Sequence, residues 1–444
     1  MADPAARPPG QKHRIVIVGG GVAGLELATR LGNGPGRAGR AEIVLVEKRR
    51  THLWKPLLHA VAAGSMDPSA HELNYLAQAH WHHFSYRLGE MVGLDRGRRE
   101  VLLGATLDDE GREITPARAI PYDTLVLAVG SVTNDFGTPG VAEFAVPLET
   151  PQQAARFNRR LVNACIHAHV QEEPIRPGQL HVAIIGAGAT GTELAAEIHR
   201  TAREVVTYGL DRVQPERDIR IILIEAAPRV LPALPERLST AVAALLGRLG
   251  VEVRTGAQVA AVDAHGVTLA GGAFLPAELV VWCAGVKGPE CLAHLDGLEV
   301  TRSNQLVVEP TLATTRDPAI FAMGDCASCP DGHGGRLPPR AQAAHQQAAH
   351  LVRSLRGRLA GRPPSPFVYR DFGSLVSLGK FSTVGNLMGV VIGRSFFVEG
   401  LMARLMYRSL YFSHESALYG PLRATTRALA RAIFRHGGPV VKLH

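Results

Sequence analysis

The sequence contains no run of about eighteen apolar residues, the length that a helix needs to cross a bilayer. Its longest uncharged stretch near the C-terminus, FSTVGNLMGVVIG, is too short for that purpose. The N-terminal MADPAARPPGQKH has no apolar segment of the kind found in secretory signals. Cysteine is also scarce, with five scattered residues in 444. These absences argue against a membrane-spanning or secreted protein and predict a reducing cytoplasm as the compartment.

Acidic and basic residues nearly balance except near the C-terminus. The formal net charge is +8, and 46% apolar against 20% charged residues is an ordinary globular composition. Residues 394–444 contain eight Lys or Arg and two Glu, so most of the net charge lies there. Aromatic, Leu and Met residues are mixed with these arginines, a pattern that favours an anionic lipid surface over nucleic acid. We therefore expect lipid as a partner and no nucleic acid.

Glycine is abundant and forms two similar motifs. RIVIVGGGVAGLELATRLG predicts a strand, a turn and a helix, with Gly19, Gly21 and Gly24 in G-x-G-x-x-G spacing. The first glycine of this motif allows a tight turn, the second lets a pyrophosphate approach the backbone, and the third lets helix and strand pack closely. The next strand, EIVLVE, ends in Glu47, which is placed to accept ribose hydroxyls. The stretch therefore predicts a dinucleotide-binding cradle.

The second motif repeats this arrangement. LHVAIIGAGATGTELAAEIHR contains Gly186, Gly188 and Gly191 in the same spacing, and the strand IRIILIE ends in Glu225. A carboxylate there accepts from a 2′-hydroxyl but repels a 2′-phosphate, so we expect NADH to be preferred over NADPH. Arg229 follows shortly and is placed to soften that repulsion. Two complete cradles predict a dinucleotide-binding domain interrupted by a second one.

These motifs lie among others with a family resemblance. The stretches HLWKPLLHAVAAGS, IFAMGDCASCP, LPPRAQAAHQQA, YRDFGSLVSLGKFSTVGNLMG and the terminal VKLH resemble the bacterial type II, non-proton-pumping NADH:quinone oxidoreductases. That family belongs to the two-dinucleotide-binding flavoproteins, and the resemblance runs from about Arg14 to His444. Ala60 departs from it, because the family often has Glu after the histidine that corresponds to His59.

The resemblance implies an α/β fold with two Rossmann-like dinucleotide-binding domains and a C-terminal amphipathic membrane-associating region. FAD would occupy the outer domain and NADH the inserted one, with a membrane quinone as acceptor, at the cytoplasmic face of the bacterial inner membrane. The resemblance is compatible with a homodimer. The expected domains are 1–150 (FAD-binding, first part), 151–303 (NADH-binding), 304–350 (FAD-binding, second part, with the quinone-site helix) and 351–444 (flavin-capping and membrane-surface region).

The resemblance also implies functional residues. Gln342 and Gln346 would line the quinone pocket, Lys380 would lie by the flavin ring, and Glu197 would relay protons. The expected FAD contacts are Gly19, Gly21, Val22, Ala23, Gly24, Glu47, Lys48, Lys55, Ala128, Gly130, Gly324, Asp325, Ala343 and Lys380. The expected NADH contacts are Gly186, Gly188, Thr190, Gly191, Glu193, Glu225, Ala284 and Gly285.

Three other functions remain to be weighed. A sulfide:quinone oxidoreductase shares the architecture but needs cysteines beside the flavin that attack sulfur, and no motif places Cys165, Cys283 or Cys326 there. A disulfide reductase is poorly supported, because it carries a cysteine pair soon after the first cradle and the first cysteine here is Cys165. A membrane-tethered dinucleotide sensor would keep both cradles without a quinone site. Cys326 and Cys329 are spaced C-x-x-C, but two ligands do not make a structural zinc site, so we expect no metal.

The basic tail is expected to be helical. The stretch RATTRALARAIFR places Arg423, Arg427, Arg431 and Arg435 four residues apart. Apolar residues Leu422, Leu429 and Ile433 lie between them, and residues 396–412 predict a similar helix. Such helices fit a lipid surface, with apolar faces at the acyl boundary and arginines reaching phosphates. Packing on the enzyme's own core or on a dimer partner is the alternative.

Overall fold

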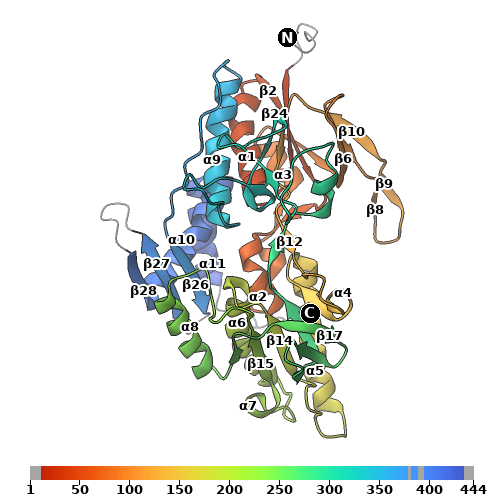
Figure 1. Ribbon diagram of the computed structural model, residues 1–444, viewed down its shortest axis with the longest axis vertical. Helices are drawn as coiled ribbons and strands as arrows, with labels where there is room; N and C mark the ends of the chain where they lie inside the picture. The colour runs from red at the N-terminus through yellow and green to blue at the C-terminus, as the bar shows by residue number, and fades with distance from the viewer. Residues whose placement is uncertain (1–11, 379–381, 389–394, 435–444) are drawn as a thin grey trace. The chain divides into compact units, whose positions relative to one another are not determined.

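The computed structural model describes residues 12–378, 382–388 and 395–434 and divides into two compact units (Figure 1). Unit 1 comprises Met1–Trp54, Glu72–Val132 and Lys287–Arg370. Unit 2 comprises Lys55–His71, Thr133–Val286 and Asp371–His444. Each unit is thus assembled from three separate stretches of chain.

The centre of unit 1 is a six-stranded sheet in the order β23-β24-β11-β1-β2-β5. Its strands are β1 (His13–Val18), β2 (Ala41–Glu47), β5 (Ser85–Leu88), β11 (Thr124–Leu127), β23 (Ala313–Thr314) and β24 (Asp317–Ala322). All the pairings are parallel except that of β23 with β24. The central strands are continuous apolar runs, as buried parallel strands usually are, and Leu125, Val126 and Leu127 are fully buried. Helices α1 (Val22–Leu31) and α9 (Ala341–Arg358) pack against each other.

Smaller elements complete unit 1. An antiparallel sheet has the order β10-β7-β6, and β8 and β9 form a separate hairpin. The bounds are α3 (Tyr75–Trp81), β3 (Thr51–His52), β4 (Leu73–Asn74), β6 (Met91–Asp95), β7 (Glu100–Leu103), β8 (Thr106–Leu107), β9 (Glu113–Thr115), β10 (Arg118–Pro121), β22 (Leu306–Val307) and β25 (Ala327–Ser328). A 3₁₀ turn, Gly324–Cys326, follows β24.

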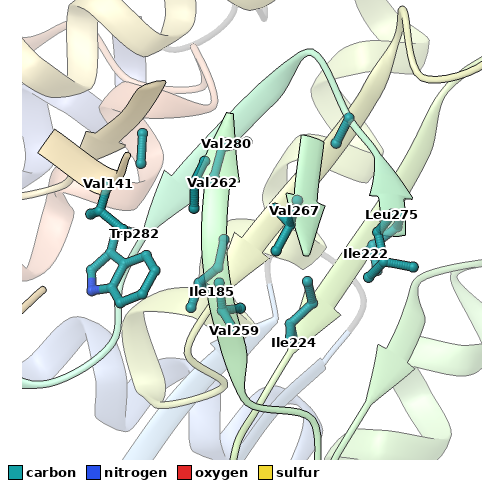
Figure 2. Close-up of a cluster of buried hydrophobic side chains, with 13 residues drawn as sticks. Val141, Ile185, Ile222, Ile224, Val259, Val262, Val267, Leu275, Val280 and Trp282 are labelled. Atoms are coloured by element: carbon teal, nitrogen blue, oxygen red, sulfur yellow. The ribbon is translucent and has the colours of Figure 1, made fainter. Parts of the chain in front are cut away.

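Unit 2 is built on a five-stranded parallel sheet in the order β13-β20-β14-β15-β16. Its strands are β13 (Ala145–Pro147), β14 (His181–Ile185), β15 (Arg220–Ile224), β16 (Glu252–Arg254) and β20 (Leu279–Trp282). An antiparallel sheet of β17 (Val259–Asp263), β18 (Gly266–Leu269) and β19 (Phe274–Pro276) accompanies it. Figure 2 shows the shared apolar cluster, in which Ile222, Val267 and Trp282 are buried together.

Unit 2 also contains α-helices ahead of its C-terminal part. They are α2 (Leu58–Ala62), α4 (Val141–Phe144), α5 (Pro151–Val170), α6 (Ala189–Val206), α7 (Pro215–Asp218) and α8 (Glu236–Arg248). Short helix α2 packs against both α5 and α6. Helix α5 begins with a capping box between Thr150 and Gln153 and with Pro151 in its first turn, features that fix a helix start.

The C-terminal part of unit 2 differs from the prediction in one respect. Antiparallel strands β26 (Ser374–Leu378), β27 (Ser382–Met388) and β28 (Ser395–Glu399) precede α10 (Gly400–Tyr419) and α11 (Pro421–Phe434). The predicted helix over 396–412 is therefore wrong at its start, because the β-favouring run SFFVE pairs with β27. Helix α10 packs on this sheet and on α11. Throughout the described ranges, no helix is long and apolar enough to cross a membrane.

Candidate active site

The first cradle lies in unit 1, at the turn from β1 to α1. Gly19 has a φ of +103°, and a Cβ there would lie 2.3 Å from the carbonyl oxygen of Ala128. A Cβ at Gly24 would lie 1.9 Å from the carbonyl oxygen of Gly19. No atom lies within 4 Å of the position that a Cβ of Gly21 would take. The first and third glycines therefore serve close packing, and the second leaves the space that a pyrophosphate needs.

The second cradle, in unit 2, repeats this geometry. Gly186 has a φ of +99°, and its Cβ would lie 2.7 Å from Cα of Ala284. A Cβ at Gly191 would lie 2.0 Å from the carbonyl oxygen of Gly186, whereas a Cβ at Gly188 would meet nothing within 4 Å. Helices α1 and α6 both begin without a side-chain cap. Their first N–H groups therefore remain available to an anion, so both cradles fit a dinucleotide.

Each cradle is tied to the carboxylate at the end of the following strand. In unit 1, Oε2 of Glu47 accepts the backbone N–H of Gly20 at 2.7 Å. In unit 2, Oε2 of Glu225 accepts the backbone N–H of Ala187 at 2.8 Å. The two donors are equivalent, because each follows the first glycine of its motif. Strand β2 ends at Glu47, as the sequence predicted, and β15 ends at Ile224, one residue before Glu225. Contact of either carboxylate with a ribose remains a prediction.

Four further predicted FAD residues of unit 1 lie just after the carboxyl ends of neighbouring strands. Ala128 and Gly130 follow β11, and Gly324 and Asp325 follow β24, which pairs with β11. Oδ2 of Asp325 accepts from the hydroxyl of Ser131 at 2.9 Å.

Backbone groups beside Asp325 have side-chain partners too. The N–H of Gly324 donates to Oε1 of Gln347 at 2.7 Å, and Nε2 of Gln305 donates to the carbonyl oxygen of Asp325 at 2.9 Å. Ser131, Gln305 and Gln347 were missed by the sequence analysis. Their partners lie 194, 20 and 23 residues away, beyond any local motif.

The three lysines predicted to contact FAD lie in different parts of the chain. Lys48 forms an ion pair with Glu90 at 2.7 Å on the surface of unit 1. Lys55 begins the 3₁₀ turn Lys55–Leu57 of unit 2, and its contact with FAD remains a prediction. Lys380 lies outside the described residues.

Two buried glutamates lie one turn apart on α6. Oε2 of Glu193 is 3.3 Å from Nδ1 of His59, and both side chains are less than 10% exposed. Glu197 forms an ion pair with Arg200, one turn further along the same helix. A buried carboxylate needs such partners, and neither His59 nor Arg200 was named as one from the sequence. The proton-relay role of Glu197 stays a prediction.

The two predicted quinone-site glutamines lie on the first turns of α9, which begins at Ala341. Gln346 pairs its amide with the main chain of Arg370, accepting its N–H at 3.0 Å and donating to its carbonyl oxygen at 2.7 Å. Gln342 donates more weakly to the same oxygen, at 3.4 Å, and accepts from the hydroxyl of Tyr369 at 3.3 Å. The structure thus brings the two glutamines together on one backbone segment. Ala343 is buried between them in sequence.

An α/β chain with two such cradles, one interrupting the other, is a flavoprotein with two dinucleotide-binding domains. The family model for pyridine nucleotide-disulphide oxidoreductases matches residues 13–348. The type II NADH:quinone oxidoreductase of Haemophilus influenzae is 38% identical over 442 residues, covering 97% of this chain and 99% of that protein. The chain therefore belongs to the type II NADH:quinone oxidoreductase family.

Other relatives agree with this assignment. The type II NADH:quinone oxidoreductase Ndh of Mycobacterium tuberculosis is 31% identical over 429 residues, covering 93% of this chain and 86% of that one. Among solved structures, NDH2 from Plasmodium falciparum in complex with NADH has a TM-score of 0.81 at 18% identity, covering 97% of this chain and 100% of that chain. That structural likeness shows a common fold, as the sequence motifs predicted.

Proposed function

We propose that this protein is a NADH:quinone oxidoreductase that takes two electrons from NADH and passes them, through FAD, to a membrane quinone. One observation carries the proposal: two cradles of the same construction, with Glu47 bonded to Gly20 and Glu225 bonded to Ala187. We assign FAD to the cradle of unit 1 and NADH to that of unit 2. The relatives named type II NADH:quinone oxidoreductase support this reading.

The residues of the chain act mainly by binding and orienting. FAD, when bound, supplies the two-electron chemistry that connects NADH with a quinone. The uncapped starts of α1 and α6 hold phosphates, and Glu225 holds the ribose of NADH through a charge-assisted hydrogen bond. Asp325 and Ser131 present a carboxylate and a hydroxyl, a pair suited to a ribityl chain. Binding in fixed geometry is the main contribution that a protein makes to hydride transfer.

The quinone side is proposed to involve α9. Gln342 and Gln346 hold the backbone of Arg370, so their side chains shape the wall of the site through that segment. Lys380 is proposed to face the flavin ring, and Glu197 to hold a proton near the nicotinamide. The start of α9, whose first turn contains no acidic residue, suits developing negative charge nearby.

The C-terminal helices are proposed to bind anionic lipid at the cytoplasmic face of the bacterial inner membrane. On α11, Leu422 is 78% and Leu429 61% exposed, although both are apolar. Arg423 is exposed on the same helix. Arg427 instead lies over the ring of Tyr419, at 4.6 Å, and 4.0 Å from Glu415. That arginine anchors α11 to α10, and a homodimer remains the competing use of this exposed face.

Thiol chemistry is poorly supported. Burial raises the pKa of Cys165, Cys326 and Cys329 to about 11 and that of Cys283 to about 12. Since the thiolate is the nucleophile, these cysteines are poor candidates for attack on sulfur or for disulfide exchange. The sulfide:quinone and disulfide-reductase alternatives are therefore disfavoured.

The test is an anaerobic titration of the purified protein. Addition of NADH should bleach the flavin absorbance, and a water-soluble quinone should restore it. Bleaching without reoxidation by quinone would contradict the quinone reaction, while a flavin that NADH leaves unchanged would favour a dinucleotide sensor. Bleaching by sulfide in place of NADH would favour the sulfide:quinone alternative.

A further inference from the structure

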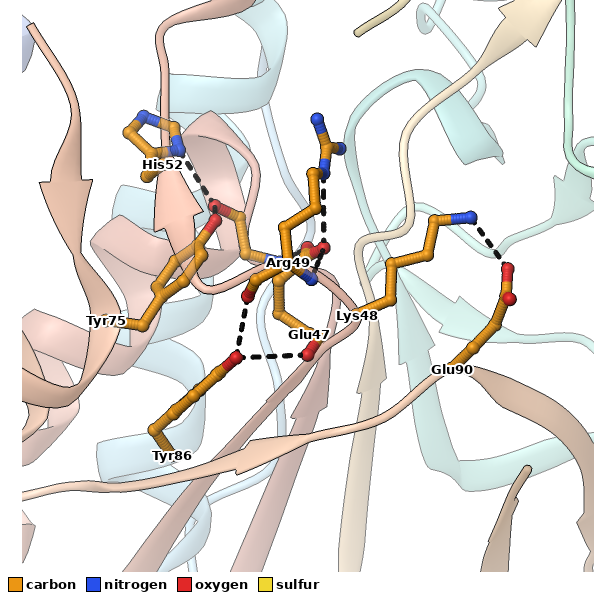
Figure 3. Close-up of polar contacts among 8 residues, drawn as sticks. Glu47, Lys48, Arg49, His52, Tyr75, Tyr86 and Glu90 are labelled. Carbon is orange, nitrogen blue, oxygen red and sulfur yellow. Dashed lines mark hydrogen bonds and ion pairs between the residues drawn. The ribbon is translucent and has the colours of Figure 1, made fainter. Parts of the chain in front are cut away.

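Side chains hold both backbone polar groups of Gly20, in the first cradle, and Figure 3 labels the three residues that do so, Glu47, His52 and Tyr75. Its N–H donates to Oε2 of Glu47 at 2.7 Å. Its carbonyl oxygen accepts from the hydroxyl of Tyr75 at 2.7 Å and lies 3.0 Å from Nδ1 of His52. These groups come from the end of β2, from α3 and from β3, so three segments converge on the backbone of one residue.

The second cradle secures the equivalent residue differently. The N–H of Ala187 donates to Glu225, as expected from the repeat. The carbonyl oxygen of Ala187, however, accepts the backbone N–H of Leu231 at 2.8 Å. The carbonyl group at this position is therefore hydrogen-bonded by the main chain in unit 2 and by side chains in unit 1. We call the two side-chain bonds to the Gly20 carbonyl, from Tyr75 and His52, the latch.

This difference explains a glycine that the G-x-G-x-x-G spacing does not require. A Cβ on Gly20 would lie 2.5 Å from the hydroxyl oxygen of Tyr75 and 2.7 Å from two carbons of its ring. Ala187, the equivalent residue, has a Cβ and is fully buried. The ring of Tyr75 therefore occupies the space that a side chain at position 20 would need.

The two side-chain donors are held in a fixed chemical state. Burial lowers the pKa of His52 to about 4 and raises that of Tyr75 well above its ordinary value. Both are neutral near neutral pH, and the proton of His52 lies on Nδ1 because a carbonyl oxygen accepts there. The ring of Tyr75 stacks on that of Tyr86, with centroids 5.4 Å apart, which fixes its orientation.

We propose that Tyr75 and His52 are positioning residues for FAD, which hold the carbonyl group of Gly20 so that the start of α1 faces the pyrophosphate. This inference rests on the proposed assignment of FAD to unit 1. It deepens that assignment by making FAD retention depend on two side chains, while binding at the second cradle is independent of them.

The test compares two tyrosine-to-phenylalanine variants of the holoenzyme. Tyr75→Phe keeps the ring but removes the donor to Gly20. Tyr86→Phe is the matched control, because its hydroxyl donates to the carbonyl oxygen of Arg49 at 2.6 Å and, more weakly, to that of Glu47 at 3.4 Å, and not to Gly20. The rate of FAD release on dilution, followed by free-flavin fluorescence, should rise about five- to tenfold for Tyr75→Phe, the worth of about one buried hydrogen bond. It should change less than about twofold for Tyr86→Phe, and the Kd for NADH should change in neither.

His52 provides a rescue test. His52→Leu removes the donor, whereas His52→Asn places an amide N–H close to the position of Nδ1. FAD release should accelerate in the first variant and return toward the wild-type rate in the second. Equal release rates for Tyr75→Phe and Tyr86→Phe, or no difference between the His52 variants, would overturn the latch and leave the proposed function intact. A wild-type protein that takes up no FAD would overturn both.

Discussion

The carboxylate of Glu225 is bonded to the backbone N–H of Ala187 at 2.8 Å, and its other oxygen accepts the N–H of Ala227 at 2.9 Å. Two main-chain donors thus fix its orientation beside the second cradle. Arg229, which was expected to soften the repulsion of a 2′-phosphate, donates to the carbonyl oxygen of Leu234 at 2.7 Å and to the hydroxyl of Ser239 at 2.8 Å. Its guanidinium is therefore already engaged within this segment and α8.

We therefore predict a preference for NADH over NADPH of at least about tenfold in kcat/KM, since a fixed carboxylate repels a 2′-phosphate. Glu225→Ser should reduce this ratio, mainly by improving NADPH. Glu252→Ser is a control and should leave the ratio unchanged, because Glu252 pairs with Arg220 of the neighbouring strand β15 and with Arg254 of its own strand β16. Equal efficiency of the wild-type enzyme with both nucleotides in steady-state kinetics would refute the prediction.

Gln346→Trp should slow quinone reduction by about tenfold or more while bleaching of the flavin by NADH stays close to the wild-type rate. The bulky ring removes both hydrogen bonds to Arg370 and shifts that segment. Stopped-flow traces of the two half-reactions measure the effect separately. Arg353→Trp, at an exposed position on the same helix, controls for the added bulk. If both half-reactions slowed equally, Gln346 would serve the fold and not the quinone.

His345 should make stability depend on pH. Its Nδ1 lies 2.5 Å from Oε2 of Glu26, which is fully buried on α1 and also pairs with Arg30 at 2.8 Å. Hydrogen bonding to Glu26 raises the pKa of His345 in the folded protein above its ordinary value. The stabilisation is therefore complete below the pKa of the unfolded chain and is lost as pH rises through the folded pKa.

His345→Gln should accordingly lower Tm more at about pH 6 than at about pH 9. His333→Gln, on an exposed loop, should show no such difference. Thermal unfolding at both pH values measures it. A loss of Tm that is equal at the two pH values would show that the pair contributes through packing alone.

Lipid binding is best tested on α11. Removing residues 395–444 would also delete β28 and α10, whose His414, Glu415 and Leu418 are buried. Arg423→Gln should instead weaken binding to anionic vesicles about fivefold, from the loss of one surface charge. Arg353→Gln, on α9, should not. Sedimentation with vesicles measures this, and unchanged binding by an Arg423→Gln, Leu422→Ser double variant would exclude α11 as the lipid contact.

The sequence predicted those parts of the site that are local in the chain. Both G-x-G-x-x-G turns and the acids Glu47 and Glu225 are set by short segments, since strand, turn and helix follow one another directly. The latch on Gly20 was not predictable, because Tyr75 lies 55 residues away and LNYLAQ resembles any short helix. Phe396 and Phe397 were assigned to a helix because their pairing with β27 is a tertiary preference that an apolar stripe does not reveal.

The glycines of each cradle fall into two kinds with different evolutionary constraints. Replacing Gly24 or Gly191 by alanine meets a carbonyl oxygen at 1.9 or 2.0 Å, so the polypeptide alone resists the change. An alanine at Gly21 or Gly188 meets no protein atom within 4 Å. A mutant library sorted for abundance in cells would thus tolerate alanine at the second pair and reject it at the first, whereas a library sorted for respiration would reject all four. Positions where alanine is tolerated for abundance but not for respiration would therefore be those that face the bound dinucleotides.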